Sequence, residues 1–173
     1  ARSRSSPRAW ARPPAGLGEG GYWARVLVRS RGGQPPIEQQ RGDVRVQLDV
    51  ETVFVVALNY RNGSVSTGLS VVDASARRTA DGIEATIDLD RLGNAAFIGR
   101  VRAELLDGRG RVVNASEEVL AVYRGIRRRL VVPVPASAAG PFRVRFVMDT
   151  DRDDLPAGAA LPFAPLAHIV DVP

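Results

Sequence analysis

Cysteine is absent from all 173 residues, so the chain can form neither a disulfide framework nor a thiolate metal site. Lysine is absent too, and every one of the 24 basic side chains is Arg. With His168 as the single histidine, a His-based metal cluster is excluded. Aromatic residues make up only 6% of the chain, so a packed core must consist mostly of Val, Leu and Ala.

Long apolar segments are missing as well. No run approaches the ~20 residues that a membrane-spanning helix needs, and the first residues lack the apolar h-region of a signal peptide. We therefore expect no membrane insertion. The sequence starts at Ala1 rather than Met, so a leader could have been removed or the chain could be a fragment. From the organisation of the first 60 residues we interpret the chain as truncated at its N-terminus.

The net charge of +5 would usually favour nucleic acid as a partner. The arginines, however, mostly stand singly between apolar residues, as Arg100 and Arg102 do. That spacing is typical of the solvated face of a strand, and we expect no nucleic-acid partner.

Residues 61–173 contain short alternating segments separated by turn residues such as Asn62-Gly63, Asp81-Gly82, Gly93-Asn94 and Asp107-Gly108. No window has a convincing helical period. The pattern predicts an all-β, immunoglobulin-like antiparallel β-sandwich over 61–173. The predicted strands are 64–75, 83–90, 97–107, 111–124, 127–135 and 141–149. The end of the chain, LPFAPLAHIVDVP, is Pro-rich, and we interpret His168 there as an incidental surface or strand residue.

The first 60 residues are organised differently. Residues 1–20 are rich in Arg, Ser, Pro and Gly and are predicted to be disordered. GYWARVLVRS (21–30) alternates as a strand, and residues 31–43 form a turn-rich connector. GDVRVQLDV (42–50) alternates again, whereas VFVVALNYR (53–61) begins with a nearly continuous apolar run that we expect to be buried on both faces. Because two strands cannot form a stable sandwich alone, we interpret 21–60 as the C-terminal strands of an incomplete first immunoglobulin-like domain.

Taken in order, these segments resemble a known family. GYWARVLVRS followed by DVRVQLDVETVFVVALNYR resembles the last two strands of the first domain of periplasmic pilus-assembly chaperones, which have two immunoglobulin-like domains. GNAAFIGRVRAEL (93–105) and VYRGIRRRLVVPVP (122–135) are similar to second-domain segments of chaperone-like members of that superfamily.

The resemblance implies a function in pilus or fimbria assembly, in the periplasm or at the cell surface. The last strand of the first domain would pair with a protein partner, such as a pilin-like subunit that lacks a strand. Tyr60 and Arg61 would lie near the interdomain elbow. One departure is that the Lys which anchors the subunit in those chaperones would fall near Ala57, and this chain has none. The partner-binding residues would be Val44, Val46, Leu48 and Val50.

Other interpretations of the same residues stay open. Val44 to Val50 could pack on the core of their own sandwich instead of binding a partner. The alternative function is a structural or adhesive immunoglobulin-like module of a larger surface protein, and a glycan-binding or small-ligand-binding sandwich is a third candidate.

The remaining polar clusters suggest no chemistry. Asp149, Asp151 and Asp153 are spaced like calcium ligands, but Ala160 stands where a calcium loop has Glu, so we expect a plain acidic loop. The run Arg127-Arg128-Arg129 could bind phosphate, but solvated arginines at a strand entry are the favoured interpretation. We predict a non-enzyme with no catalytic residues, no metal and no cofactor.

Overall fold

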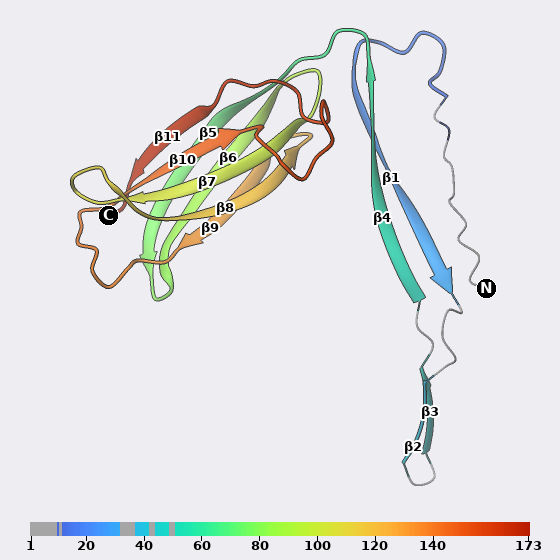
Figure 1. Cartoon of the computed structure of the whole chain (residues 1–173), viewed down its shortest axis with the longest axis horizontal. Helices are drawn as coiled ribbons and strands as arrows, with labels where there is room; N and C mark the ends of the chain where they lie inside the picture. The colour runs from blue at the N-terminus through green and yellow to red at the C-terminus, as the bar shows by residue number, and fades with distance from the viewer. Residues whose placement is uncertain (1–9, 11, 32–36, 42–43, 49–50) are drawn as a thin grey trace. The chain divides into compact units, whose positions relative to one another are not determined.

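The structure is a computed structural model that describes Trp10 and residues 12–31, 37–41, 44–48 and 51–173. For residues 31, 37–41 and 44–48 it describes the backbone alone. The chain divides into two compact units, Gly21–Arg61 and a larger unit of Ala1–Gly20 with Asn62–Pro173. The described residues form strands and no helix, and therefore contain no helix that could cross a membrane (Figure 1).

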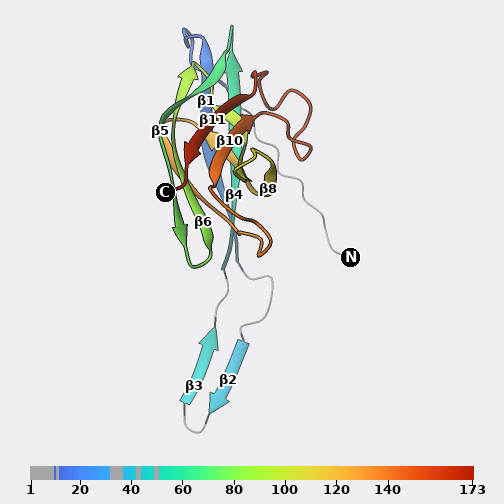
Figure 2. The ribbon, with the colours of Figure 1, turned by 90° about the vertical axis from the view of Figure 1, so that its left-hand side faces the viewer.

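Seven strands in two antiparallel sheets build the larger unit (Figures 1 and 2). One sheet has the order β11-β10-β7-β8, and the other has the order β5-β6-β9. The two sheets share one hydrophobic core, so the predicted β-sandwich is confirmed; its immunoglobulin-like character stays a prediction. The strands are β5 (Thr67–Thr79), β6 (Gly82–Gly93), β7 (Phe97–Leu106), β8 (Val112–Val122), β9 (Ile126–Val132), β10 (Arg143–Asp149) and β11 (Leu166–Asp171).

The sandwich forms because its strands have one apolar face each. In β6 and β10 every second residue is buried over most of the strand, and the residues between are partly or fully exposed. Since side chains alternate between the faces of a strand, this spacing directs one whole face into the core. The largest fully buried side chains include Phe97, Phe146, Ile83, Ile87 and Leu89.

Two of the predicted turns depend on glycine. Gly82, between β5 and β6, has a φ of 138°, and a Cβ there would lie 2.4 Å from the carbonyl oxygen of Val132. Gly93, at the end of β6, has a φ of 78°, and a Cβ there would lie 2.5 Å from the carbonyl oxygen of Ser66. Both turns require glycine locally, because other residues rarely adopt a positive φ. In addition, the backbone of Val132 and Ser66 leaves no room for a side chain.

The C-terminal segment adds a seventh strand to the six predicted for the sandwich. Leu166–Asp171 forms β11 and pairs with β10, with Val144 opposite Val170 and Phe146 opposite His168. His168 is half-buried, on the same side of the strand as Leu166 and Val170, which pack against the core. The prolines of this region lie before and after β11 and none lies within it, so the Pro-rich composition does not prevent strand pairing.

The smaller unit also contains more strand than predicted. β1 (Gly20–Arg31) pairs with β4 (Glu51–Asn62), and the two run in opposite directions (Figure 1). β2 (Ile37–Arg41) pairs antiparallel with β3 (Val44–Leu48). The prediction of a connector over 31–43 is therefore wrong at Ile37–Arg41, because these residues find hydrogen-bonding partners in β3. Residues 32–36 and 42–43 lie outside the described part.

Side chains of the sandwich core should dominate its stability. Phe146 is 0% exposed, so Phe146→Ala is expected to lower the free energy of unfolding by about 3–5 kcal/mol. Val119 lies on β8 with 55% of its surface exposed, and Val119→Ala should change the free energy by less than about 0.5 kcal/mol. Urea unfolding followed by circular dichroism measures both, and equal effects of the two substitutions would contradict this core.

Candidate functional site

The predicted partner-binding residues fall largely on β3. Val44, Val46 and Leu48 lie opposite Arg41, Gln39 and Ile37 of β2. Val50 lies outside the described residues. Among the described residues β3 has β2 as its single neighbour, so its second edge faces no other strand. Whether the β3 side chains bind a partner stays a prediction, since the structure describes their backbone alone.

The neighbouring strands β1 and β4 form a two-stranded ribbon with exposed apolar side chains, which we call the ribbon. Sequence reasoning predicts that 53–61 is buried on both faces, and this is wrong, because nearly every residue of β4 is exposed. β1 is the one strand that pairs with β4 among the described residues, and no described layer covers either face. The exposed large apolar side chains of the ribbon are Tyr22, Trp23, Val26, Leu27, Val28, Val53, Phe54, Val55, Val56, Leu58 and Tyr60.

Tyr60 and Arg61 close the smaller unit, and the next residue, Asn62, belongs to the larger one. The side-chain amide of Asn62 donates hydrogen bonds to the carbonyl oxygens of Leu17 and Gly18, at 2.8 and 3.0 Å. These bonds tie the segment before β1 to the start of the larger unit. The elbow predicted at Tyr60 and Arg61 lies at this boundary in the sequence and stays a prediction.

One edge of the sandwich is closed by side chains. From β8, the Asn114 amide donates to the carbonyl oxygen of Pro133, and the Ser116 hydroxyl donates to that of Val131, both at 2.7 Å. Glu118, two residues further along β8, forms an ion pair with Arg128 of β9 at 3.3 Å. Sequence reasoning missed this arrangement, although polar residues at spacing two within a predicted strand are its signal. These side chains occupy the β9 edge that a further strand would need.

Each arginine of the run 127–129 lies against a carboxylate. Arg127 holds both oxygens of Asp88 at 2.6 Å, and Arg129 lies 3.6 Å from Glu84. The bidentate hydrogen bond from Arg127 lowers the pKa of Asp88 and raises that of Arg127. These partners already neutralise the guanidinium groups, which disfavours the phosphate-binding interpretation.

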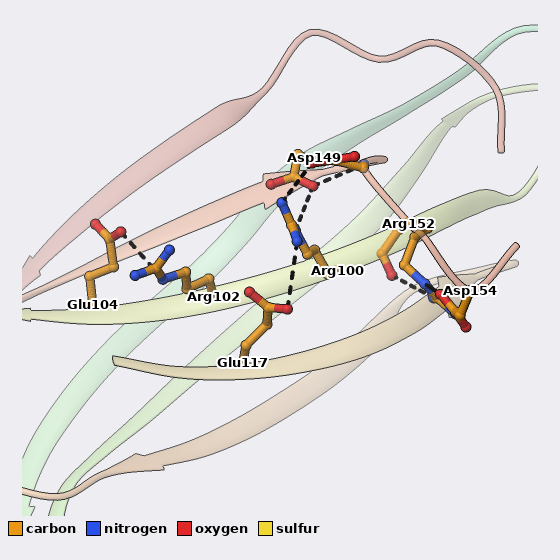
Figure 3. A network of polar contacts seen from close by, with 9 residues as sticks. Arg100, Arg102, Glu104, Glu117, Asp149, Arg152 and Asp154 are labelled. Atoms are coloured by element: carbon orange, nitrogen blue, oxygen red, sulfur yellow. Dashed lines mark hydrogen bonds and ion pairs between the residues drawn. The ribbon is translucent and has the colours of Figure 1, made fainter. Parts of the chain in front are cut away.

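The acidic loop after β10 is organised around arginine (Figure 3). Arg100 of β7 donates to Asp149 at 2.8 Å and to Asp151 at 3.2 Å, and lies 3.8 Å from Glu117. The hydrogen bond to Asp149 raises the pKa of Arg100. Among the described residues no three acidic or His side chains gather as metal ligands would. Two of the three carboxylates of the predicted acidic loop therefore bind a protein cation.

A cavity of about 700 Å³ lies between the β7–β8 turn and the loop after β9, with Asp107, Arg109 and Ser137 in its wall. Asp107 is buried, and its carboxylate accepts hydrogen bonds from the backbone amides of Arg109 and Arg111 and from the Arg111 side chain, each at 2.9 Å. These bonds, those of Arg111 first, lower the pKa of Asp107. A carboxylate with these partners holds a turn and is poorly suited to accept a proton from a substrate.

Comparisons with known proteins add no identification. No protein-family model matches the chain, and neither the curated proteins nor the solved structures contain a match. Function must therefore be argued from the residues and contacts described above.

Because of the lowered pKa of Asp107, the free energy of unfolding should decrease at acidic pH. Its folded-state pKa lies below the unfolded value of about 3.9, so its contribution is present above pH ~4 and is lost as the pH falls through the folded pKa. Asp107→Asn should therefore lower the unfolding free energy more at pH 7 than at pH 3. Asp81→Asn, in the exposed β5–β6 turn, is the control, and urea unfolding at both pH values is the measurement. An equal loss at both pH values would show that the charge of Asp107 contributes nothing.

Proposed function

We propose that this chain is an extracytoplasmic, chaperone-like binding protein that captures a protein partner by β-strand pairing within Gly21–Arg61. The observation that carries the proposal is the pairing pattern of this unit. Among its described residues, β3 and β4 each have one neighbouring strand, and an unpaired strand edge is a template for a strand from another protein.

The contrast between the two units supports this proposal. In the sandwich, Asn114 and Ser116 fill the carbonyl edge of β9 with side-chain hydrogen bonds. In the ribbon, β1 and β4 pair with each other and with no other described strand, so the second edge of each is open among the described residues. Natural proteins protect strand edges that should stay unpaired, so a chain that protects one edge and leaves another open has a use for the open one.

The class of partner follows from the sequence resemblance to pilus-assembly chaperones. In that scheme Val44, Val46, Leu48 and Val50 fill a groove in a subunit that lacks a strand, and the protein acts in the periplasm or at the cell surface. Each apolar side chain would contribute about 1.5–3 kcal/mol when fully buried. This role needs no catalytic group, in keeping with a binding protein rather than an enzyme.

Two charges on the pairing face test the proposal. Val46→Glu combined with Leu48→Glu should lower recovery of the copurifying partner at least ~10-fold, because the carboxylates would lose their water in the groove. Gln47→Glu adds a charge at the intervening position of β3 and should leave recovery unchanged. Partner recovery is quantified by mass spectrometry after affinity purification of each variant.

The outcome separates the two candidate functions. Unchanged recovery with a double variant that keeps its sandwich unfolding transition would overturn strand pairing at β3. A structural or adhesive module would then account better for the chain.

A further inference from the structure

The ribbon has two chemically different faces. Because side chains alternate along a strand, the even-numbered residues of β1 and β4 project to one side and the odd-numbered residues to the other. The ion pair between Arg29 and Glu51, at 3.9 Å, shows that odd-numbered residues of both strands share a face. We call the opposite side the even face, and its large residues are Tyr22, Val26, Val28, Phe54, Val56, Leu58 and Tyr60.

Charge distinguishes the two faces. From Tyr22 to Tyr60, no even-numbered residue of β1 or β4 is Arg, Asp or Glu. The odd face also has apolar residues, such as Trp23 and Val55, but it mixes them with charges. Those charges are Arg25, Arg29, Glu51 and Arg61.

The even face is exposed over its whole length. Its seven large side chains are each between 37% and 58% exposed. Continuous apolar patches of this kind mark contact surfaces. A fully buried aromatic side chain removes about 150–250 Å² of surface from water. Because these seven side chains are already about half-covered and four of them are smaller than an aromatic, covering them would remove on the order of 500 Å² of accessible surface per chain.

We infer that the even face packs against the even face of a second copy of this chain, in a two-fold symmetric dimer. A two-fold interface brings the same surface patch of two copies together, so a patch with an excess of one charge repels its copy. The even face carries no charged side chain although the chain has a net charge of +5, whereas the odd face carries more arginines than carboxylates and would repel its copy. A single two-stranded ribbon is marginally stable in water because nothing covers its apolar face. Two ribbons packed face to face form two layers that cover each other.

The area also sets the strength of this dimer. About 1,000 Å² in total lies at the lower limit for a specific interface and below the ~1,600 Å² of a standard one. The dimer is therefore weak and reversible. At high protein concentration the dimer covers the even face of each copy. The edges of the strands lie outside this contact. The inference concerns β1 and β4 and does not depend on partner binding by β3.

A matched pair of variants of the whole chain tests the dimer. Val56 on the even face and Val53 on the odd face lie on the same strand and are 46% and 45% exposed. Val56→Arg should weaken self-association at least ~10-fold in sedimentation equilibrium, since it places a charge in the dry contact. Val53→Arg should change the dissociation constant by less than ~3-fold.

The lack of cysteine supplies a second measurement that does not require a disruptive substitution. Val56→Cys should give covalent dimers with a short bismaleimide, and Val53→Cys should give far fewer. A wild-type chain that stays monomeric at high micromolar concentration, or equal effects at both positions, would overturn the dimer. If Val56→Arg abolishes the dimer but still recovers the partner, the dimer is independent of the partner binding proposed for Val46 and Leu48.

Discussion

The whole chain depends on one constraint, which is that an alternating strand must cover its apolar face. In the sandwich, β6 and β10 do so by packing Ile87, Leu89, Val144 and Phe146 into a core shared by both sheets. In the ribbon, β1 and β4 have the same kind of alternation, but the described residues supply no opposing layer. The same physical pattern therefore stabilises one unit and makes an association surface of the other.

Arginine chemistry organises the sandwich surface. The planar guanidinium of Arg127 binds both oxygens of Asp88, and two nitrogens of the Arg145 guanidinium lie 2.6 Å from one oxygen of Glu104. Each of these pairs joins neighbouring strands of one sheet. The arginines that first suggest phosphate binding, and two of the aspartates that suggest calcium, are thus used within the protein. The basic overall charge consequently says little about partners.

Much of the sandwich could be predicted because its signals are local. Alternation located six of its seven strands to within a few residues, and glycine turns such as Gly82 separated them. β11 could not be recognised from its Pro-rich surroundings, because its hydrogen bonds come from β10, which lies far away in the sequence. The strand at Ile37–Arg41 was missed for the same reason, since it is defined by its pairing with β3. At the candidate site, the alternation of Val44, Val46 and Leu48 was visible in sequence, whereas the edge caps at Asn114 and Ser116 were not recognised.

The sequence by itself determined six of the seven sandwich strands and which face of each of these strands is apolar, because side-chain alternation is a property of the local backbone. Tertiary structure decided which of those faces are covered, which edges are closed and which charges are paired. The apolar run from Val53 to Leu58 shows the difference: its composition predicts burial, but burial requires a second layer. Ion pairs such as that between Arg100 and Asp149 depend likewise on β7 and β10 lying side by side, which no local pattern specifies.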